Sequence, residues 1–69
     1  MDTRDLLFIS KIDSLHMAFA GNSLESIKNL VDDIPKQYEK GKLSVDHYIA
    51  LMNTGKTYMR ILKEDNRNV

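Results

Sequence analysis

The spacing of apolar residues restricts this chain to helices. Between residues 24 and 38 they recur at intervals of three and four, the heptad spacing of a helix that packs along one seam. The seam consists of Leu24, Ile27, Val31, Ile34 and Tyr38. No stretch alternates apolar and polar residues as a half-buried strand would. The sequence therefore predicts an all-α fold.

A first helix is predicted over residues 3–20. Asp2 or Thr3 caps its start by accepting a bond from a free backbone amide, and Gly21 supplies a left-handed stop. Ile9 and His16 are expected to widen a buried apolar stripe on this helix. The stripe consists of Phe8, Ile12, Leu15 and Phe19.

A second helix is predicted over residues 23–40, and Gly41 is expected to end it. Asn22 and Glu25 have the spacing of a capping box, and Ser23 is the alternative N-cap. Pro35 lies inside the helical pattern, where it removes an amide donor and clashes with the preceding turn. The spacing on either side of Pro35 stays in phase, which predicts either a kink or a stop with an immediate restart.

A third helix is predicted over residues 44–63, with Ser44 as its N-cap. Leu43 and Tyr48 have the spacing of a hydrophobic staple. One face collects Tyr48, Leu51, Met52, Gly55, Tyr58, Met59 and Leu62. Residues 64–69 are expected to form a frayed polar tail. Because the connections are short, residues 1–69 are predicted to form one domain, a three-helix bundle or bent helical array with antiparallel neighbours.

Composition limits what this fold can contain. A chain of 69 residues buries only a small core, and the absence of cysteine excludes disulfides and thiolate metal sites. The apolar run at residues 6–9 is too short for a signal peptide or a membrane span. We expect a soluble, cytoplasmic protein that does not bind a membrane.

The string Gly55-Lys56-Thr57 resembles the end of a phosphate-binding loop. Such a loop also needs a glycine at position 50, where this chain has Ala50, and it must follow a buried strand. Here the string lies within a predicted helix, so no nucleotide binding is expected. On the apolar face of that helix, Gly55 instead predicts a close approach of another helix backbone or a bend.

No pattern in the chain predicts catalysis. Asp13 and His16 are three residues apart and share a helix face, as a metal pair or an acid–base pair would. His16 also lies beside the buried stripe, which favours a packed histidine. Asp46 and His47 are interpreted as residues of a helix start. We expect no enzyme activity, no metal and no cofactor.

Charge is distributed unevenly along the chain. Residues 1–33 carry three basic and six acidic side chains, a net charge of −3, whereas residues 34–69 carry seven basic and four acidic ones, a net charge of +3. The two halves either neutralise each other on packing or leave a basic surface on the second half. The basic residues of the third helix form a stripe that consists of Lys56, Arg60, Lys63 and Arg67.

This basic stripe has several interpretations. It pairs with Asp32 and Asp33, remains solvated, docks onto an acidic protein surface, or contacts DNA through a helix–turn–helix. The zero net charge of the chain and Asp46 at the start of the third helix disfavour DNA.

The first helix has more apolar residues than one stripe requires. Leu6 and Met17 share a second face, and Leu7 and Ala18 share a third. A helix that is apolar on several sides is buried on several sides. The surplus predicts an interface, either with another protein or in a homodimer. The alternative is a central helix packed between the other two.

These features favour a small non-enzymatic regulator, such as an inhibitor, antirepressor or modulator, that docks an apolar helix face with a basic flank onto a partner. The predicted contact residues are Leu6, Leu7, Met17, Lys56, Met59, Arg60 and Lys63. The segments SLESIKNL and KLSVDHY resemble the Hha-type modulators of bacterial nucleoid proteins over about half of the chain. The resemblance implies a DNA-binding protein as partner, although that family's acidic-histidine-basic cluster has no counterpart in MNTGKTYMR. A small secretion-system chaperone is a further alternative.

Overall fold

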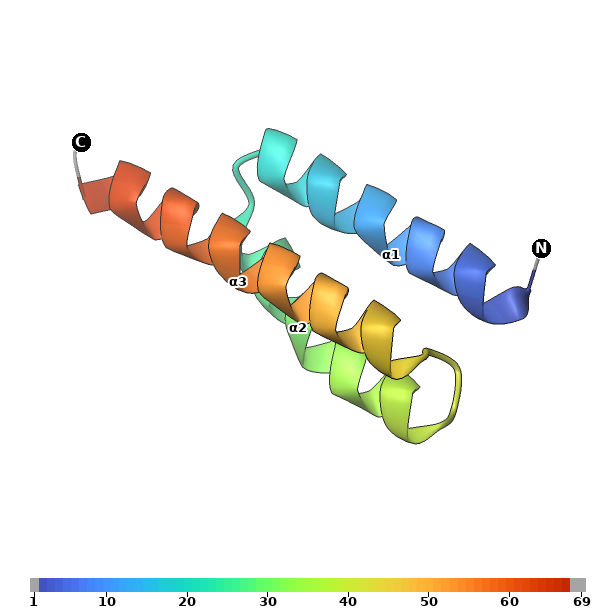
Figure 1. The fold of residues 1–69 in the computed structure, drawn as a ribbon. Helices are drawn as coiled ribbons and strands as arrows, with labels where there is room; N and C mark the ends of the chain where they lie inside the picture. The colour runs from blue at the N-terminus through green and yellow to red at the C-terminus, as the bar shows by residue number, and fades with distance from the viewer. Residues whose placement is uncertain (1, 68–69) are drawn as a thin grey trace.

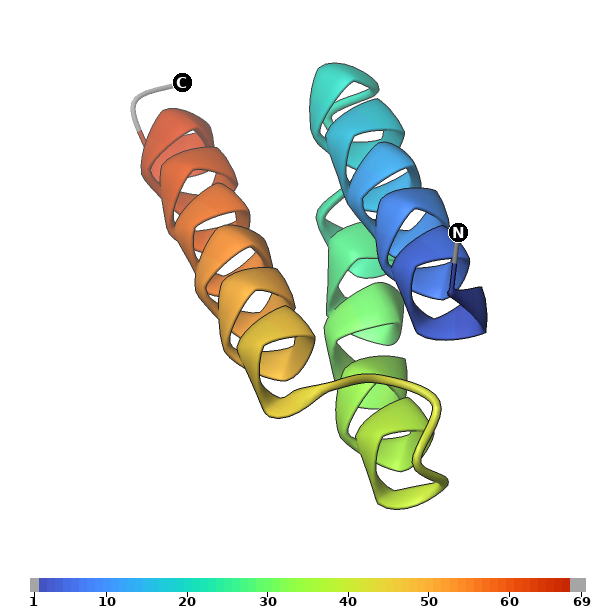
Figure 2. The same cartoon turned by 45° about the vertical axis from the view of Figure 1, so that its right-hand side comes forward.

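Three α-helices form the fold. In the computed structural model, which describes residues 2–67, α1 spans Thr3–Ala20, α2 spans Leu24–Glu39 and α3 spans Val45–Arg67. Helices α1 and α3 run in the same direction, and α2 is antiparallel to both (Figures 1 and 2). The prediction of an all-α three-helix bundle with antiparallel neighbours is confirmed.

The helix ends lie close to the predicted ones, except at the C-terminus. The range of α1 is the predicted one, and α2 is shorter than predicted by one residue at each end. Helix α3 continues to Arg67, so its predicted end at residue 63 is four residues too early. Of the predicted frayed tail, residues 64–67 are helical and residues 68–69 lie outside the described part of the chain.

The link between α1 and α2 corrects two predictions. Asn22, not Gly21, takes the left-handed conformation, with φ of 60° against −82°. The amide of Asn22 donates to Phe19 O at 3.0 Å and that of Ser23 donates to Ala18 O at 2.9 Å, which is a Schellman ending of α1. Asn22 therefore ends α1 and does not cap α2. The cap is Ser23, whose Oγ accepts from the Ser26 amide at 3.3 Å.

The link between α2 and α3 follows the prediction. Gly41 has φ of 75°, and the Lys42 amide donates to Gln37 O at 3.0 Å, so α2 also has a Schellman ending. Ser44 caps α3 through its Oγ, which accepts from the His47 amide at 3.1 Å. Leu43 is 3% exposed and belongs to the core, against which Tyr48 also packs. The link therefore tethers the start of α3 to the bundle.

Pro35 does not interrupt α2. The helix is continuous from Leu24 to Glu39, so the alternative of a stop and restart is wrong. Proline has no amide proton, which leaves the Val31 carbonyl without its usual helical donor. Val31 and Ile34 in the turn before Pro35 are buried, which keeps this turn packed against the neighbouring helices.

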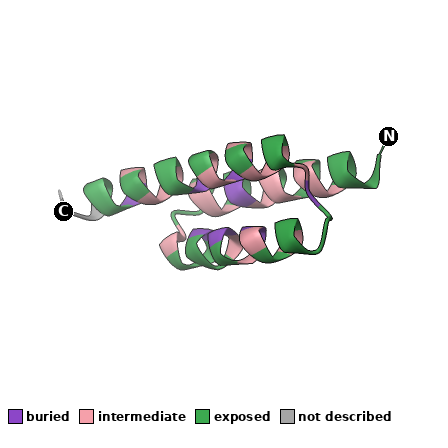
Figure 3. Ribbon diagram, turned by 60° about the horizontal axis from the view of Figure 1, so that its bottom comes forward, coloured by how far each residue is buried: buried purple, intermediate pink, exposed green. Residues whose placement is uncertain are grey.

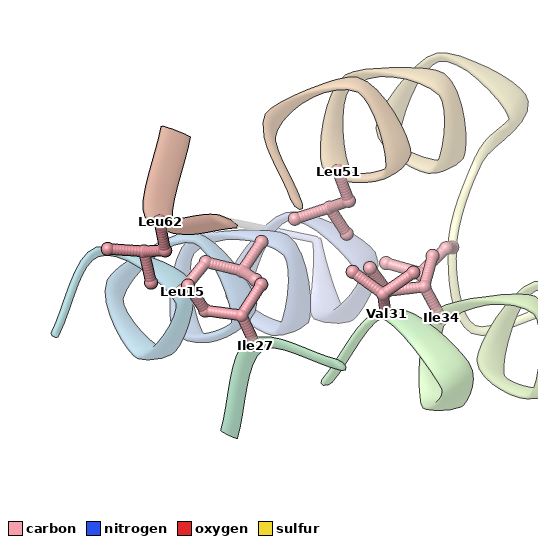
Figure 4. Close-up of a cluster of buried hydrophobic side chains, with 7 residues drawn as sticks. Leu15, Ile27, Val31, Ile34, Leu51 and Leu62 are labelled. Atoms are coloured by element: carbon pink, nitrogen blue, oxygen red, sulfur yellow. The ribbon is translucent and has the colours of Figure 1, made fainter. Parts of the chain in front are cut away.

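The core lies between the three helices (Figure 3). Side chains from all three helices point toward one another in this space (Figure 4). The fully or nearly fully buried residues are Leu15, Ile27, Val31, Ile34, Leu43, Leu51 and Leu62. Helix α1 contributes only Leu15 to this set, whereas α2 contributes three residues. The heptad seam of α2 is thus the centre of the bundle.

Gly55 lies where α3 packs tightly against α2. It is buried on α3, and a Cβ atom added there would overlap the Cγ2 methyl of Val31 and lie 3.7 Å from Leu15 Cδ2. The Val31 side chain of α2 therefore occupies the space that a side chain at position 55 would need. Gly55 thus accommodates a side chain of α2 against α3 within a single chain.

Two aromatic stacks fix how α1 lies against α3. Phe8 stacks on His47 with ring centroids 4.5 Å apart, and Phe19 stacks on Tyr58 at 4.2 Å. Each pair is separated by 39 residues, since 47 − 8 and 58 − 19 are equal. A constant offset is expected for two parallel helices with the same rise per residue. The stacks therefore hold α1 and α3 in a single register over three turns.

Three residues are more exposed than their predicted places imply. Ile9 is 44% exposed and His16 is also exposed, so neither widens the buried stripe of α1. The reason is that α2 and α3 cover two sides of α1 and leave its outer side to solvent. Tyr38 at the end of the seam is 40% exposed, although its ring packs against Tyr48 at 4.7 Å.

Within residues 2–67, no helix combines the length and the apolar character that crossing a membrane requires.

Candidate functional site

An exposed stripe runs along one flank of α3. It consists of Val45, Ile49, Lys56, Arg60 and Lys63 and is called the α3 stripe below; all five side chains are exposed. At about 100° per residue these positions lie on one side of the helix. Met52 and Met59 lie along its edge and are partly buried against the core. The stripe lies about a third of a turn from the core-facing side of α3, whose members are Leu51, Gly55 and Leu62.

The first two turns of the α3 stripe are apolar. Val45 is 53% exposed and Ile49 is 50% exposed. Neither belongs to the core cluster of seven buried residues. The sequence analysis did not identify these two residues as a surface. Their spacing of four, followed by Lys56 seven residues on, is the signal that could have revealed it.

The last turns of the α3 stripe are basic. A shallow hollow of about 310 Å³ is lined by Lys56, Met59, Arg60, Lys63 and Glu64, so three cations face one carboxylate. None of the three cations belongs to an ion pair within the described residues. The end of α3 also extends past the other two helices (Figures 1 and 3). The side chain of Arg67, the fourth predicted member, lies outside the described part.

The two halves of the chain do not neutralise each other through the basic stripe. Lys11 Nζ lies 2.8 Å from Asp33 Oδ2, so this ion pair joins α1 to α2 within the acidic half. The expected pairing of the α3 cations with Asp32 or Asp33 is therefore not formed in the described residues. The contact that does cross between the halves is Asp5 Oδ1 with His47 Nε2, at 3.2 Å.

Asp33 accepts hydrogen bonds from two helices. Lys11 Nζ donates to it at 2.8 Å and Gln37 Nε2 donates at 3.3 Å. The hydrogen bond from Lys11 holds the pKa of Asp33 below its ordinary value of 3.8; partial burial opposes this shift, and Gln37 adds to it. The carboxylate is thus a latch between α1 and α2.

This latch predicts an acid-dependent loss of stability. Because the pKa is lower in the folded chain, the unfolded chain binds more protons between the two pKa values, and stability falls as the pH drops through this window. Asp33 is expected to stabilise the folded chain, relative to Asp33→Asn, fully above about pH 4, and this stabilisation is lost at lower pH. Its magnitude should be no more than about 1 kcal/mol because the pair is partly exposed. Denaturant unfolding from pH 2 to 7 measures it. In a Lys11→Met background, the effect of Asp33→Asn on the free energy of unfolding should depend much less on pH. An unchanged pH dependence of this effect would exclude the latch.

The predicted surface on α1 is only partly exposed. Leu6 is 56% and Met17 74% exposed, whereas Leu7 packs against the core. Leu7 therefore offers less to a partner than the sequence suggested. An open groove of about 600 Å³ lies beside Met17, between the end of α1 and the start of α2, and four of its lining residues are Ser14, Ser23, Ser26 and Asn29. Asp13 is exposed on the same outer side, so the apolar residues of α1 are not contiguous.

The position of His47 was not predicted. It was interpreted as a residue of a helix start, but its ring stacks on Phe8 of α1 and its side chain is only 18% exposed. Its Nδ1 atom is buried without a hydrogen-bond partner in the described residues. His47 therefore forms part of the α1–α3 interface. Adjacent residues in sequence point to different sides of a helix, which hides such a contact until the neighbouring helix is placed.

The other sequence motifs lie on α1 and within α3. His16 and Asp13 are both exposed on α1, and no group of three or more potential metal ligands occurs among the described residues. Gly55-Lys56-Thr57 lies in the middle of α3, where its backbone amides take part in the helix and do not form a phosphate-binding loop. Lys56 instead lies on the α3 stripe.

No family model, curated protein or solved structure matches this chain.

Proposed function

We propose that this protein is a non-enzymatic regulator that docks the α3 stripe onto another protein. The observation that supports the proposal most strongly is that exposed apolar and basic side chains share one line along a helix whose core-facing side is already packed. Val45 and Ile49 supply apolar contact, and Lys56, Arg60 and Lys63 supply charge. Inhibition, antirepression and modulation are all activities that a module of this kind performs by covering a surface of its partner.

The apolar part of the stripe can contribute measurable binding energy. About half of the surface of Val45 and of Ile49 remains exposed in the folded chain. Covering that half contributes roughly 1 kcal/mol for each residue. Met52 and Met59 at the edge have flexible side chains that adapt to an incoming surface. These contacts favour a protein surface as the ligand of the stripe.

A nucleic acid fits the stripe less well. Phosphate groups recur along a nucleic-acid backbone and are matched by cations along the whole contact. Here the first two turns are apolar and begin next to Asp46, which is exposed. Only the half of the stripe that contains Lys56, Arg60 and Lys63 is suited to phosphate.

The proposal predicts that Ile49→Asp abolishes partner binding without unfolding the chain. The tagged chain would be purified from the cells that produce it, and the co-purifying proteins quantified by mass spectrometry. The matched control is Thr57→Asp, because Thr57 is exposed on the same helix but lies about a quarter turn from the stripe. Both variants place an aspartate inside α3, so the cost in helix propensity is similar.

The expected result is at least one protein that is retained by the wild-type chain and by Thr57→Asp and is lost with Ile49→Asp. A tagged chain that retains an untagged copy of itself by the same pattern would identify the partner surface as that of a homodimer. If neither another protein nor a second copy shows this pattern, the proposed function is wrong.

A further inference from the structure

We infer that the α3 stripe binds an acidic amphipathic helix, which carries apolar residues in its first or last turns and carboxylates in the remaining ones. This inference rests on the proposed function and specifies the chemistry of the partner segment. It follows from the spacing of the stripe, from the order of its residues and from the absence of ion-pair partners for its cations among the described residues.

The spacing of the stripe matches a helix. Together with the two methionines at its edge, the exposed residues recur at intervals of four, three, four, three and four (Val45, Ile49, Met52, Lys56, Met59 and Lys63). Contacts at this spacing form a straight seam along which a second helix packs. From Val45 to Lys63 the seam is about 27 Å long at 1.5 Å per residue, which corresponds to about five turns of a partner helix.

The order of residues along the stripe defines the order of residues in the partner. The apolar contacts lie in the first two turns of α3, and the three cations lie in the last part of the stripe. The hollow beside Met59 is lined by these cations and by Glu64. A partner helix therefore presents leucine-like side chains to Val45 and Ile49, and glutamate or aspartate to Lys56, Arg60 and Lys63.

The cations of the stripe remain available for this contact. The ion pairs in the described residues are Lys11 with Asp33 and His47 with Asp5, and neither includes a member of the stripe. Three neighbouring cations on an exposed helix repel one another, and an acidic segment removes this repulsion while it speeds association. Charge complementarity thus selects an acidic partner over a neutral one.

Neither the α3 stripe nor the exposed side of α1 in a second copy of the chain supplies the matching surface. Two α3 stripes in contact would bring six cations together or would place apolar residues against cations. The exposed side of α1 offers Leu6 and Met17, but the carboxylate between them is the single residue Asp13. One carboxylate does not balance the three cations of the stripe.

Photo-crosslinking tests this inference in the intact chain. Benzoyl-phenylalanine would replace Ile49 in one variant and Arg60 in another, and the adducts formed in the producing cells would be mapped by mass spectrometry. Positions 49 and 60 are eleven residues apart on α3. Both adducts are expected on the same partner, about eleven residues apart in one helical segment, with the adduct from position 60 next to glutamate or aspartate.

A titration with the captured segment completes the test. The segment would be synthesised and its dissociation constant measured for the wild-type chain and for Lys56→Glu combined with Arg60→Glu. We expect the affinity to fall on the order of tenfold or more, because two attractive contacts become repulsive. The matched control is Lys28→Glu combined with Lys40→Glu, which changes the same number of exposed charges on α2 and should stay within about twofold.

The outcomes separate the two proposals. Protein adducts on a basic or non-helical segment, or an affinity unchanged by the α3 charge reversal, would overturn the acidic helix and leave protein binding intact. An adduct with a second copy of the chain would also overturn it. Adducts with nucleic acid, or no adduct from either position, would contradict the proposed function as well.

Discussion

Replacing Gly55 by alanine is expected to lower the free energy of unfolding by up to about 2 kcal/mol, although alanine is the better helix former. The added methyl would overlap Val31 Cγ2, which belongs to a branched side chain with little rotational freedom in a helix. Overpacking of this kind costs about 1–3 kcal/mol, and the gain in helix propensity offsets about 1 kcal/mol of it. Denaturant unfolding of both chains measures the difference.

A second substitution distinguishes overpacking from other causes. Val31→Ala removes the methyl groups that occupy the space at position 55, so Gly55→Ala should be neutral or stabilising in that background. A double-mutant cycle of the wild-type chain, the two single variants and the double variant should give a coupling energy of at least about 1 kcal/mol. Thr57→Ala on the exposed side of α3 is the control and should stay within about 0.5 kcal/mol. If Gly55→Ala stabilises the wild-type chain, the glycine is only a tolerated weak point in α3.

Leu15→Ala is expected to have a still larger effect. Leu15 is the one fully buried residue of α1 and lies 3.7 Å from the point where a Cβ of Gly55 would be, so it contacts the centre of the bundle. Truncation of a buried leucine costs about 2–5 kcal/mol, because the transfer energy is lost and a cavity remains. In a chain of 69 residues this is a large part of the total stability.

Met17→Ala provides the matched control on the same helix. Met17 is 74% exposed, and its truncation should change the free energy of unfolding by no more than about 0.5 kcal/mol. Thermal and denaturant unfolding of the two variants should therefore differ clearly. Comparable small losses in both would mean that α1 is not held against the bundle through Leu15.

The local features of the fold were predictable from neighbouring residues. The heptad seam of α2, the left-handed Gly41 and the Ser44 cap each depend on the chemistry of a few adjacent positions, and all three are observed. The prediction for the first link was wrong because Gly21 and Asn22 are both able to take the left-handed conformation. The bonds of Asn22 and Ser23 to α1 select Asn22 for it.

Features that depend on two helices were less accessible. The exposure of Ile9 follows from which side of α1 faces α3, and the stack of His47 on Phe8 follows from the parallel register of these helices. The spacing of apolar residues shows that one face of a helix is buried. It does not show how much of the helix circumference the neighbouring helices cover. For the same reason the sequence identified the cations of the α3 stripe, whereas Val45 and Ile49 emerged only when the bundle left them uncovered.

The central claim is that the α3 stripe, and no other side of α3, contacts a partner. The most direct measurement is the yield of photo-crosslinked partner protein when benzoyl-phenylalanine is moved along the exposed positions of α3. High yields are expected at the stripe positions Val45, Ile49, Lys56, Arg60 and Lys63. Low yields are expected at Asp46 and Thr57, which are also exposed but lie about a quarter turn away. Yields that are uniform around the helix, or highest at Asp46 and Thr57, would contradict the central claim.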